Sequence, residues 1–399
     1  MKKRLIAVGL SAVMGMSLAA CGSSGSSIET SSASAASSAS SASSASAESS
    51  AAESSSESES SSGDLTKVTL QLKWVQQAQF MGYYAAKELG IYEDFGLDVD
   101  IIPGGSVDVI DEVDSGRAQF GATWVSNMMS SVSNGANVMS IAQYSQDSGV
   151  LLTSLKDTVA DGTKVSDGES VGNWGGGNEY EIQAYLANLG LSTDYVTQDY
   201  DMQQLYDGDI TWASAMTYNE LGLIYESGYT EDDLNILSME DEGVGMLEDC
   251  LIVDTDWASE NEDTVKAFVE ASSLGWLWSI KNTTAAGSLV FNAEDTANTV
   301  SEYHQQYEAS EIAKLVEGDI IDLDDPDTYV MIGYLDDDKY AQTYDILSQY
   351  VDVSNIEATS AYTSYFYDLI TQDEKYLTAL ENVDDYVWDG EYEVLYEES

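Results

Sequence analysis

The stretch LKWVQQAQFMGYYAAKELGIYEDFGLDVDI, from Leu72 to Ile101, decides the fold. A strand-like run ends at Trp74, polar glutamines follow, and an amphipathic pattern then continues to turn residues at Gly90 and Gly96. The alternating segment LDVDII comes next. A strand, a helix and a second strand in this order predict a parallel βαβ unit. Because ligands of open α/β sheets bind beyond the carboxyl ends of strands, the junction after Trp74 is a candidate binding wall.

The same alternation of strand and helix patterns recurs along the chain. The segments AQFGATW and NVMSIAQY predict two further strands around the helix VSNMMSSVSNG. SVGNWGGGNEYEIQAYLANLG then begins a second set of strands and helices, and from Ser259 onward the pattern is helical. Two such sets, separated by an extended strand and followed by a returning strand, predict an α/β fold of two hinged lobes.

The N-terminus has the pattern of an export signal. Three basic residues precede an apolar stretch, from Leu5 to Leu18, that is too short to span a membrane. The sequence LAAC ends at Cys21 and resembles the bacterial lipobox, in which the chain is cut before a cysteine that then carries lipid. An ordinary signal peptide with a chance cysteine is the alternative. We expect a signal peptide over 1–20 and attachment to the extracytoplasmic face of the cell membrane through lipid on Cys21.

Composition divides the rest of the chain. Residues 21–66 are almost entirely Ser, Ala, Gly and Glu, which cannot bury a core, so we expect a disordered tether. The remaining residues, roughly 330 of them, exceed the size at which one core stops growing. We predict that 67–152 forms the first part of lobe 1, that 153–252 forms lobe 2, and that 253–399 returns to lobe 1 and ends in helices.

Charge and composition exclude several classes of function. The net charge of −57 argues against nucleic acids and against free anionic substrates, both of which favour basic grooves. The single histidine, His304, lies in an acidic helical segment and is expected at the surface. Cys250 is flanked by acidic residues, which raise the pKa of a thiol. Without a Ser-His or Cys-His pairing we expect no enzyme, and we expect no metal and no cofactor.

Aromatic, amide and hydroxyl side chains gather where the predicted strands end. Each has a structural alternative: the aromatics could close the core, WGGGNE could be a tight turn, and Glu179 could cap a helix. Tyr83 and Tyr84 are neighbours on a helix, so at most one of them faces a cleft. Their clustering favours a flat, uncharged, nitrogen-rich ligand held by stacked rings and amide edges. The predicted ligand-binding residues are Trp74, Gln77, Gln79, Phe80, Tyr83, Trp124, Asn127, Gln146, Trp174, Gly176, Glu179, Tyr218, Asn219 and Glu220.

Several of these segments resemble one known family. KWVQQAQFMGYYAAKELGIYEDFGLDVDIIPGG, SGRAQFGATW, VMSIAQYSQDSGVLLTS, VGNWGGGNEYEIQAYLANLG and AMTYNELG are similar to solute-binding proteins of bacterial ABC importers. The subgroup captures thiamine pyrimidine precursors and, in close relatives, riboflavin. The resemblance implies a periplasmic-binding-protein type II fold with crossing strands near 149–154 and 250–254. It implies ABC permease and ATPase partners, and a monomer is expected.

The resemblance also suggests roles at the site. Trp74 and Trp174 resemble the walls on which a ligand ring stacks. The residues that would hydrogen-bond to the edge of the ring are Gln77, Gln79, Asn127 and Gln146. The residues that would close over it from lobe 2 are Tyr218, Asn219 and Glu220. Eukaryotic relatives that make the pyrimidine need a histidine donor and a cysteine-rich segment, both missing here, which implies binding without turnover. Basic residues for phosphate are not seen in the pattern, so a phosphorylated ligand is not expected. A thiamine pyrimidine precursor is the first expectation, with a riboflavin receptor or a non-transport surface sensor as alternatives.

Overall fold

The computed structural model describes residues 65–105, 107–293 and 300–397. The predicted signal peptide, the lipidated Cys21 and nearly all of the tether lie outside these residues. Within the described ranges, the helices are too short or too polar to cross a membrane.

The first lobe is built on a five-stranded sheet in the order β2-β1-β3-β10-β4. Strands β1 and β2 pair in parallel, as the opening stretch predicts, whereas β10 runs antiparallel between β3 and β4. Residues of β2 alternate between buried and exposed, while every residue of β3 is buried, because β3 is covered on both faces. The strands are β1 (Thr66–Leu72), β2 (Leu97–Ile102), β3 (Phe120–Trp124), β4 (Val138–Gln143) and β10 (Asp249–Asp254).

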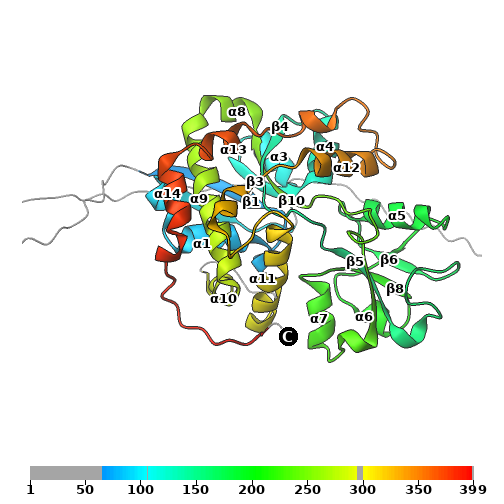
Figure 1. Cartoon of the computed structure of the whole chain (residues 1–399). Helices are drawn as coiled ribbons and strands as arrows, with labels where there is room; N and C mark the ends of the chain where they lie inside the picture. The colour runs from blue at the N-terminus through cyan, green and yellow to red at the C-terminus, as the bar shows by residue number, and fades with distance from the viewer. Residues whose placement is uncertain (1–64, 106, 294–299, 398–399) are drawn as a thin grey trace, which may run out of the picture. The chain divides into compact units, whose positions relative to one another are not determined.

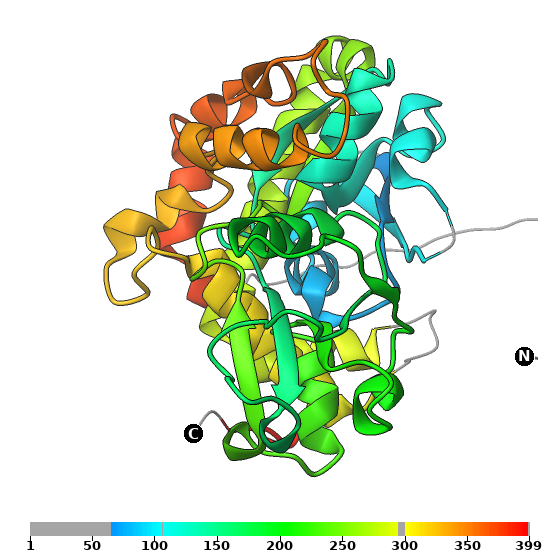
Figure 2. The same cartoon turned by 90° about the vertical axis from the view of Figure 1, so that its right-hand side faces the viewer.

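The second lobe contains a separate five-stranded sheet in the order β7-β6-β8-β5-β9. Here β6 pairs in parallel with β7 and β8, and β5 runs antiparallel to β8 and β9. Its green strands and helices face the viewer in Figure 2. The strands are β5 (Val150–Leu155), β6 (Val171–Asn173), β7 (Val196–Thr197), β8 (Trp212–Met216) and β9 (Leu234–Ser238).

The chain passes between the two sheets twice, from β4 to β5 and from β9 to β10 (Figure 1). The two passages are tied together, because the amide of Gly149 donates to Oε1 of Glu248 at 2.5 Å. The lobe limits at 152/153 and 252/253 stay a prediction. In the structure, the chain passes from one sheet to the other in the segments 144–149 and 239–248.

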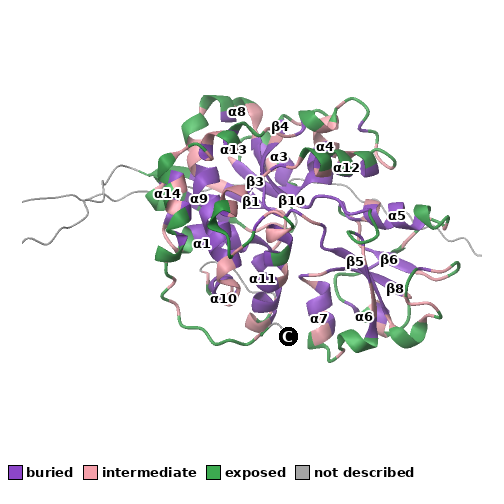
Figure 3. Cartoon of the chain, viewed as in Figure 1, coloured by how far each residue is buried: buried purple, intermediate pink, exposed green. Residues whose placement is uncertain are grey.

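Helices cover the faces of both sheets, and buried residues follow their inner sides (Figure 3). Helix α1 lies so close to α9 that a Cβ on Gly275 would stand 2.2 Å from the carbonyl oxygen of Gly82. This contact fixes the helix that follows the Trp74 junction. The helices are α1 (Met81–Glu88), α2 (Ile91–Asp94), α3 (Val109–Asp114), α4 (Val125–Ser133), α5 (Glu179–Asn188), α6 (Gln203–Tyr206), α7 (Glu220–Glu226), α8 (Thr255–Glu260), α9 (Glu262–Lys281), α10 (Thr283–Asn292), α11 (Glu302–Glu317), α12 (Asp337–Leu347), α13 (Tyr365–Ile370) and α14 (Glu374–Glu381).

The thiol of Cys250 lies inside the first sheet. Its side chain is fully buried, its Sγ donates to the carbonyl oxygen of Thr123 at 3.2 Å, and burial raises the pKa of the thiol. We therefore expect a Cys21→Ser chain to show no reaction with a disulfide-exchange reagent in native buffer, and one thiol per chain after unfolding. Absorbance of the released thiolate measures both, and stoichiometric labelling of the native protein would contradict this placement.

Candidate functional site

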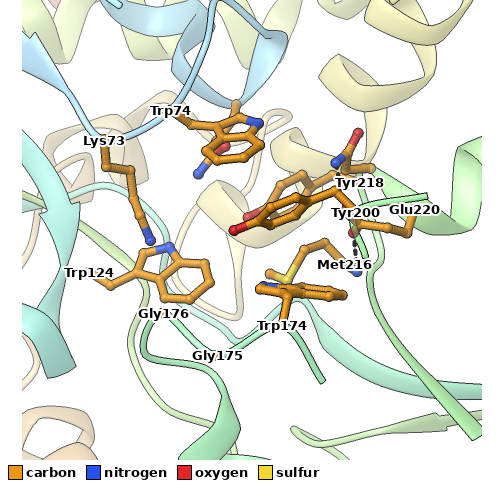
Figure 4. A pocket seen from close by; sticks show the side chains of 12 residues that line it. Lys73, Trp74, Trp124, Trp174, Gly175, Gly176, Tyr200, Met216, Tyr218 and Glu220 are labelled. Atoms are coloured by element: carbon orange, nitrogen blue, oxygen red, sulfur yellow. Dashed lines mark hydrogen bonds between the residues drawn. The ribbon is translucent and has the colours of Figure 1, made fainter. Parts of the chain in front are cut away.

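A pocket of about 160 Å³ opens between the two lobes (Figure 4). The first lobe contributes the segment after β1 and the end of β3, and the second contributes the glycine-rich turn after β6, the segment after β7 and the β8–α7 junction. Its lining residues are Lys73, Trp74, Gln79, Trp124, Trp174, Gly175, Gly176, Tyr200, Met216, Tyr218, Asn219 and Glu220.

Three aromatic rings span the pocket from one lobe to the other. The Trp74 ring lies 5.1 Å from that of Tyr200, with an angle of 47° between the planes. Tyr200 in turn lies 6.2 Å from Trp174 at 41°. Trp74 is held by its backbone, because its carbonyl oxygen accepts from the amide of Gly104 at 2.7 Å. Ring centroids at these separations are in direct contact, so Tyr200 fills the space between the two tryptophans and a flat ligand would stack on a free face of this set.

Glu220 and Asn219 form the polar side of the pocket on the second lobe. Oε2 of Glu220 accepts from the amide of Met216 at 2.9 Å, and Oε1 accepts from Nδ2 of Asn219 at 2.9 Å. Burial raises the pKa of Glu220 to about 7, so its carboxyl can either donate or accept a hydrogen bond near neutral pH. This pair can therefore form hydrogen bonds with the donors and acceptors on the edge of a heterocycle.

Glu248 and Asp249 lie behind the first-lobe wall. Asp249 accepts from Nε2 of Gln79 at 2.5 Å, and Oε2 of Glu248 accepts from the hydroxyl of Tyr218 at 3.2 Å. Burial, and then repulsion from Asp249, raise the pKa of Glu248 to about 8. These contacts position Gln79 and Tyr218, one from each lobe, through carboxyls that do not themselves line the pocket.

The structure brings eight of the fourteen predicted residues together around this pocket. They are Trp74, Gln79, Trp124, Trp174, Gly176, Tyr218, Asn219 and Glu220.

The other six predicted residues lie elsewhere. Phe80 and Tyr83 are buried in the core, where the Tyr83 ring meets Trp276 edge-on at 5.6 Å. Gln77 donates to Oδ1 of Asn219 at 3.4 Å and so supports the site from behind. Nε2 of Gln146 donates to the carbonyl oxygen of Gln143 at 2.7 Å, away from the pocket.

The last two of the six hold the glycine-rich turn. Glu179 accepts from the amide of Gly177 at 2.7 Å, and Nδ2 of Asn127 donates to the carbonyl oxygen of Gly176 at 3.0 Å. Their contacts fix the loop that carries Trp174.

His304 is not a surface residue, and the expectation that placed it there is wrong. Its side chain is fully buried, with Nδ1 2.8 Å from Oε1 of Glu226 and Nε2 3.1 Å from Oδ1 of Asn219. One side of helix α11 packs against α7 of the second lobe. This acidic helix is therefore covered there, although its sequence is typical of a solvent-exposed helix. His304 thus links the first lobe to a residue of the pocket.

Four residues of the pocket were not among the predicted ones. Gly175 and Met216 adjoin predicted positions, but Tyr200 comes from the segment TQDYDM, which has no periodicity that would mark it. Lys73 is the clearest omission, since it precedes Trp74 directly. The sequence showed no basic residue for phosphate, whereas the structure places Lys73 in the lining of the pocket.

Comparisons with known proteins agree with this architecture. The sequence pattern of the family described as "NMT1/THI5 like" matches residues 77–286. The structure is similar to a protein from Bordetella bronchiseptica RB50, with 18% identity, a TM-score of 0.55, and coverage of 77% of this chain and 97% of that one. It is similar to a putative periplasmic sulfonate-binding protein SsuA from Methylobacillus flagellatus KT, with 13% identity, a TM-score of 0.55, and coverage of 82% and 99%.

A third similar structure is the periplasmic nitrate-binding protein NrtA from Synechocystis PCC 6803, with 14% identity, a TM-score of 0.52, and coverage of 82% and 92%. No curated protein matches the chain by sequence. The predicted periplasmic-binding fold is confirmed by these likenesses. Two of these neighbours are described as periplasmic binding proteins, and the prediction that the chain is not an enzyme agrees with that description.

The buried carboxyls around the site predict a pH dependence of stability. The folded chain keeps protons on Glu220 and Glu248 up to about pH 7 and 8, whereas the unfolded chain releases them near pH ~4.5. Their contribution is therefore complete at low pH and is lost as pH rises through these folded values. We expect the melting temperature to fall between pH 5 and 8.5.

Glu248→Gln separates this effect from the general repulsion of an acidic chain. The amide keeps an acceptor for Gly149 but has no proton to lose. We expect its melting temperature to fall less steeply than that of the unaltered protein, by roughly 2–4 °C over the range. Glu242→Gln, at an exposed position, is the matched control and should follow the unaltered protein. Parallel slopes in calorimetry for all three proteins would contradict the assignment.

Proposed function

We propose, from the premise that the chain belongs to the NMT1/THI5-like family, that it is the solute-binding receptor of an ABC importer and captures an aromatic N-heterocycle. The observation that carries this proposal is the set of tilted rings of Trp74, Tyr200 and Trp174, which crosses the pocket between the lobes. The first candidate is a thiamine pyrimidine precursor.

The size of the pocket supports a single ring. Its volume of about 160 Å³ is close to the roughly 150 Å³ of an engineered cavity that accommodates benzene. A pyrimidine matches that volume, whereas the three fused rings of a flavin require the lobes to open further. Riboflavin is therefore the second candidate.

The polar contacts support a ring with both donors and acceptors on its edge. Asn219 and Glu220 come from the second lobe, and Gln79 comes from the first. Two stacked faces at about 1 kcal/mol each and three hydrogen bonds at about 1 kcal/mol each give roughly −5 kcal/mol. Burial of the ring faces would have to supply the roughly 3 kcal/mol still needed for a micromolar dissociation constant. In this arrangement the carboxyl group at the ligand edge belongs to Glu220, whereas the predicted Glu179 holds the glycine-rich turn.

The wider setting is also part of the proposal. A lipid on Cys21 and the Ser/Ala-rich tether would hold the monomeric receptor at the extracytoplasmic face of the membrane. A permease and an ATPase would receive and move the ligand. A non-transport surface sensor is the alternative, and neighbouring genes for a permease and an ATPase would favour the receptor.

Titration of tryptophan fluorescence tests the ligand class. The chain has eight tryptophans, two of which face one another across the pocket through Tyr200, so a bound ring should quench emission. We expect at least one pyrimidine from a panel of pyrimidines, flavins, sulfonates and nitrate to bind below about 100 μM. Mass spectrometry of the natively purified protein provides a second reading of the same question. A panel in which only sulfonate or nitrate binds would overturn the proposal.

A further inference from the structure

We propose that the ligand carries an oxyanion, and that Nζ of Lys73 and Nε1 of Trp124 bind it where the aromatic pocket meets a second cavity. This inference rests on the proposed function, because it requires a ring in the first pocket. It adds a charged substituent to that ring and makes Lys73 a specificity-determining residue.

The second cavity gives such a substituent somewhere to lie. It has a volume of about 330 Å³ and shares Lys73 and Gly176 with the aromatic pocket. Four of its ten lining residues carry a hydroxyl or an amide, and none is aromatic, which suits a polar group better than a second ring. Its lining residues are Lys73, Val107, Asp108, Val109, Ile110, Thr123, Asn127, Ser130, Ser131 and Gly176.

Lys73 carries an ammonium that other residues leave unpaired. Its Nζ lies 3.0 Å from the centroid of the Trp124 ring, and no described residue forms a hydrogen bond or ion pair with it. Elsewhere in this acidic chain, partly buried lysines do find carboxylates. Nζ of Lys266 lies 2.5 Å from Glu270, and Nζ of Lys339 lies 2.5 Å from Asp147. An ammonium with three donors and only a ring face as partner is available to an acceptor from outside.

Trp124 adds a second unpaired donor at the same place. The side chain is almost fully buried, and its Nε1 has no hydrogen-bond partner among the described residues. Figure 4 shows the Lys73 ammonium beside the indole of Trp124 at the edge of the aromatic pocket. A buried indole N–H without a partner is costly, and an oxyanion with one oxygen on the indole N–H and another on the ammonium would remove that cost.

Nearby acids form no hydrogen bond or ion pair with these donors, although Oδ1 of Asp249 is buried without a partner and Asp249 is the acid that attracts Lys73 most strongly. Asp249 accepts from Gln79 and Glu248 from Tyr218 and Gly149, all described above. Glu179 accepts from Gly177, and Asp108 caps α3 through the amide of Ile110 at 2.9 Å. The first turn of α4, which begins beside Trp124, contains no acidic residue, so its dipole also favours an anion.

Charge on the rest of the surface acts at longer range. It is screened over about 8 Å at physiological ionic strength. It therefore slows the approach of an anion more than it weakens a short contact inside the cleft.

A matched pair of probes tests the inference. We would compare 4-amino-5-hydroxymethyl-2-methylpyrimidine with the corresponding 5-carboxylate and 5-phosphomethyl compounds by calorimetry at pH 7 and 0.15 M salt. We expect at least one of the two anions to bind ten times more tightly than the alcohol. The carboxylate and phosphate arms show which oxyanion the second cavity accommodates.

Variants then connect the preference to the two donors. Lys73→Met keeps a long side chain over Trp124, and Trp124→Phe keeps a ring without the N–H. We expect each to lower the preference for the anion, measured as the ratio of the dissociation constants of the alcohol and the anion, at least fivefold. Lys156→Met removes an exposed lysine of the second lobe and should leave the preference unchanged.

The pH dependence gives an independent reading. Burial lowers the pKa of Lys73 to about 8, against the opposing influence of Asp249, Glu248, Cys250 and Glu179. The ammonium is therefore lost above that pH, while the carboxylate probe keeps its charge. We expect affinity for the carboxylate, relative to the alcohol, to fall several-fold from pH 7 to pH 9, and this fall should be missing in Lys73→Met.

The possible failures are distinguishable. If the alcohol binds and neither anion binds better, or if the preference survives in Lys73→Met, the inference is overturned and the heterocycle receptor stands. If no pyrimidine binds at all, the proposed function fails and this inference fails with it.

Discussion

Trp174→Ala should weaken binding of the pyrimidine ligand at least tenfold. The Trp174 ring is the second-lobe wall of the pocket and reaches Trp74 through Tyr200, so its removal takes away a stacking face and loosens Tyr200. Stacking of a heterocycle on an aromatic side chain contributes about 1–3 kcal/mol, which corresponds to roughly five- to more than a hundredfold in affinity. Because the Trp174 side chain is only partly buried, the free energy of unfolding should change little.

Fluorescence titration and calorimetry measure the loss, and Trp388→Ala is the matched control. Trp388 stacks on Tyr392 in the C-terminal segment, and neither residue lines the pocket. Trp388→Ala removes a ring of the same size and should leave the affinity for the pyrimidine ligand unchanged. If Trp174→Ala instead binds normally but melts several degrees lower, the ring supports the fold and does not contact the ligand.

The strand-to-helix junction could be read from sequence because its information is local. Strand β1 ends at Leu72, the chain turns, and Trp74 must stand beyond the carboxyl end of the sheet. The same logic located Trp124 at the end of β3 and Trp174 directly after β6. Strand-end aromatics are predictable in this fold because the sheet itself determines where they point.

Tyr200 and His304 were not predictable because their positions depend on contacts between distant segments. Tyr200 is 56% exposed and reaches Trp74 only because the two lobes approach one another. His304 pairs with Glu226, 78 residues earlier in the chain. Lys73 was missed for another reason: the overall charge of the chain says nothing about one ammonium that its acidic neighbours leave free.

The antiparallel strands show a similar limit in the fold. The extended segments around Val150 and Cys250 were expected to cross between lobes. Their pairing, β5 between β8 and β9 and β10 between β3 and β4, depends on partners far away in sequence. Periodicity identifies a strand but not its neighbour.

Gly177→Ala should weaken ligand binding at least tenfold while the protein still folds. Gly177 has φ +121°, and a Cβ there would stand 2.8 Å from Oδ1 of Asn127, 2.9 Å from Oγ of Ser126 and 3.1 Å from Cε3 of Trp124. All three atoms belong to the first lobe, whereas Gly177 belongs to the turn of the second. The methyl group therefore acts on the contact between the lobes, which must form for Trp174 to face Trp74.

Two costs have to be separated in this variant. An alanine with positive φ loses about 1 kcal/mol or more wherever it occurs, and this cost falls on the folded second lobe whether or not ligand is bound. Gly168→Ala imposes the same kind of strain, with φ +88°, at a turn where a Cβ would meet nothing within 4 Å. Both variants should lose similar thermal stability, but only Gly177→Ala should lose affinity.

Small-angle scattering provides the measurement of closure. With saturating ligand, the Gly168→Ala protein should have the same radius of gyration as the unaltered protein, and Gly177→Ala should keep a larger one. Equal affinities in the two glycine variants would mean that the contact of Gly177 with Ser126 and Asn127 is not needed for binding. In that case the ligand would be held by the rings and polar groups without the turn between β6 and α5 reaching the first lobe.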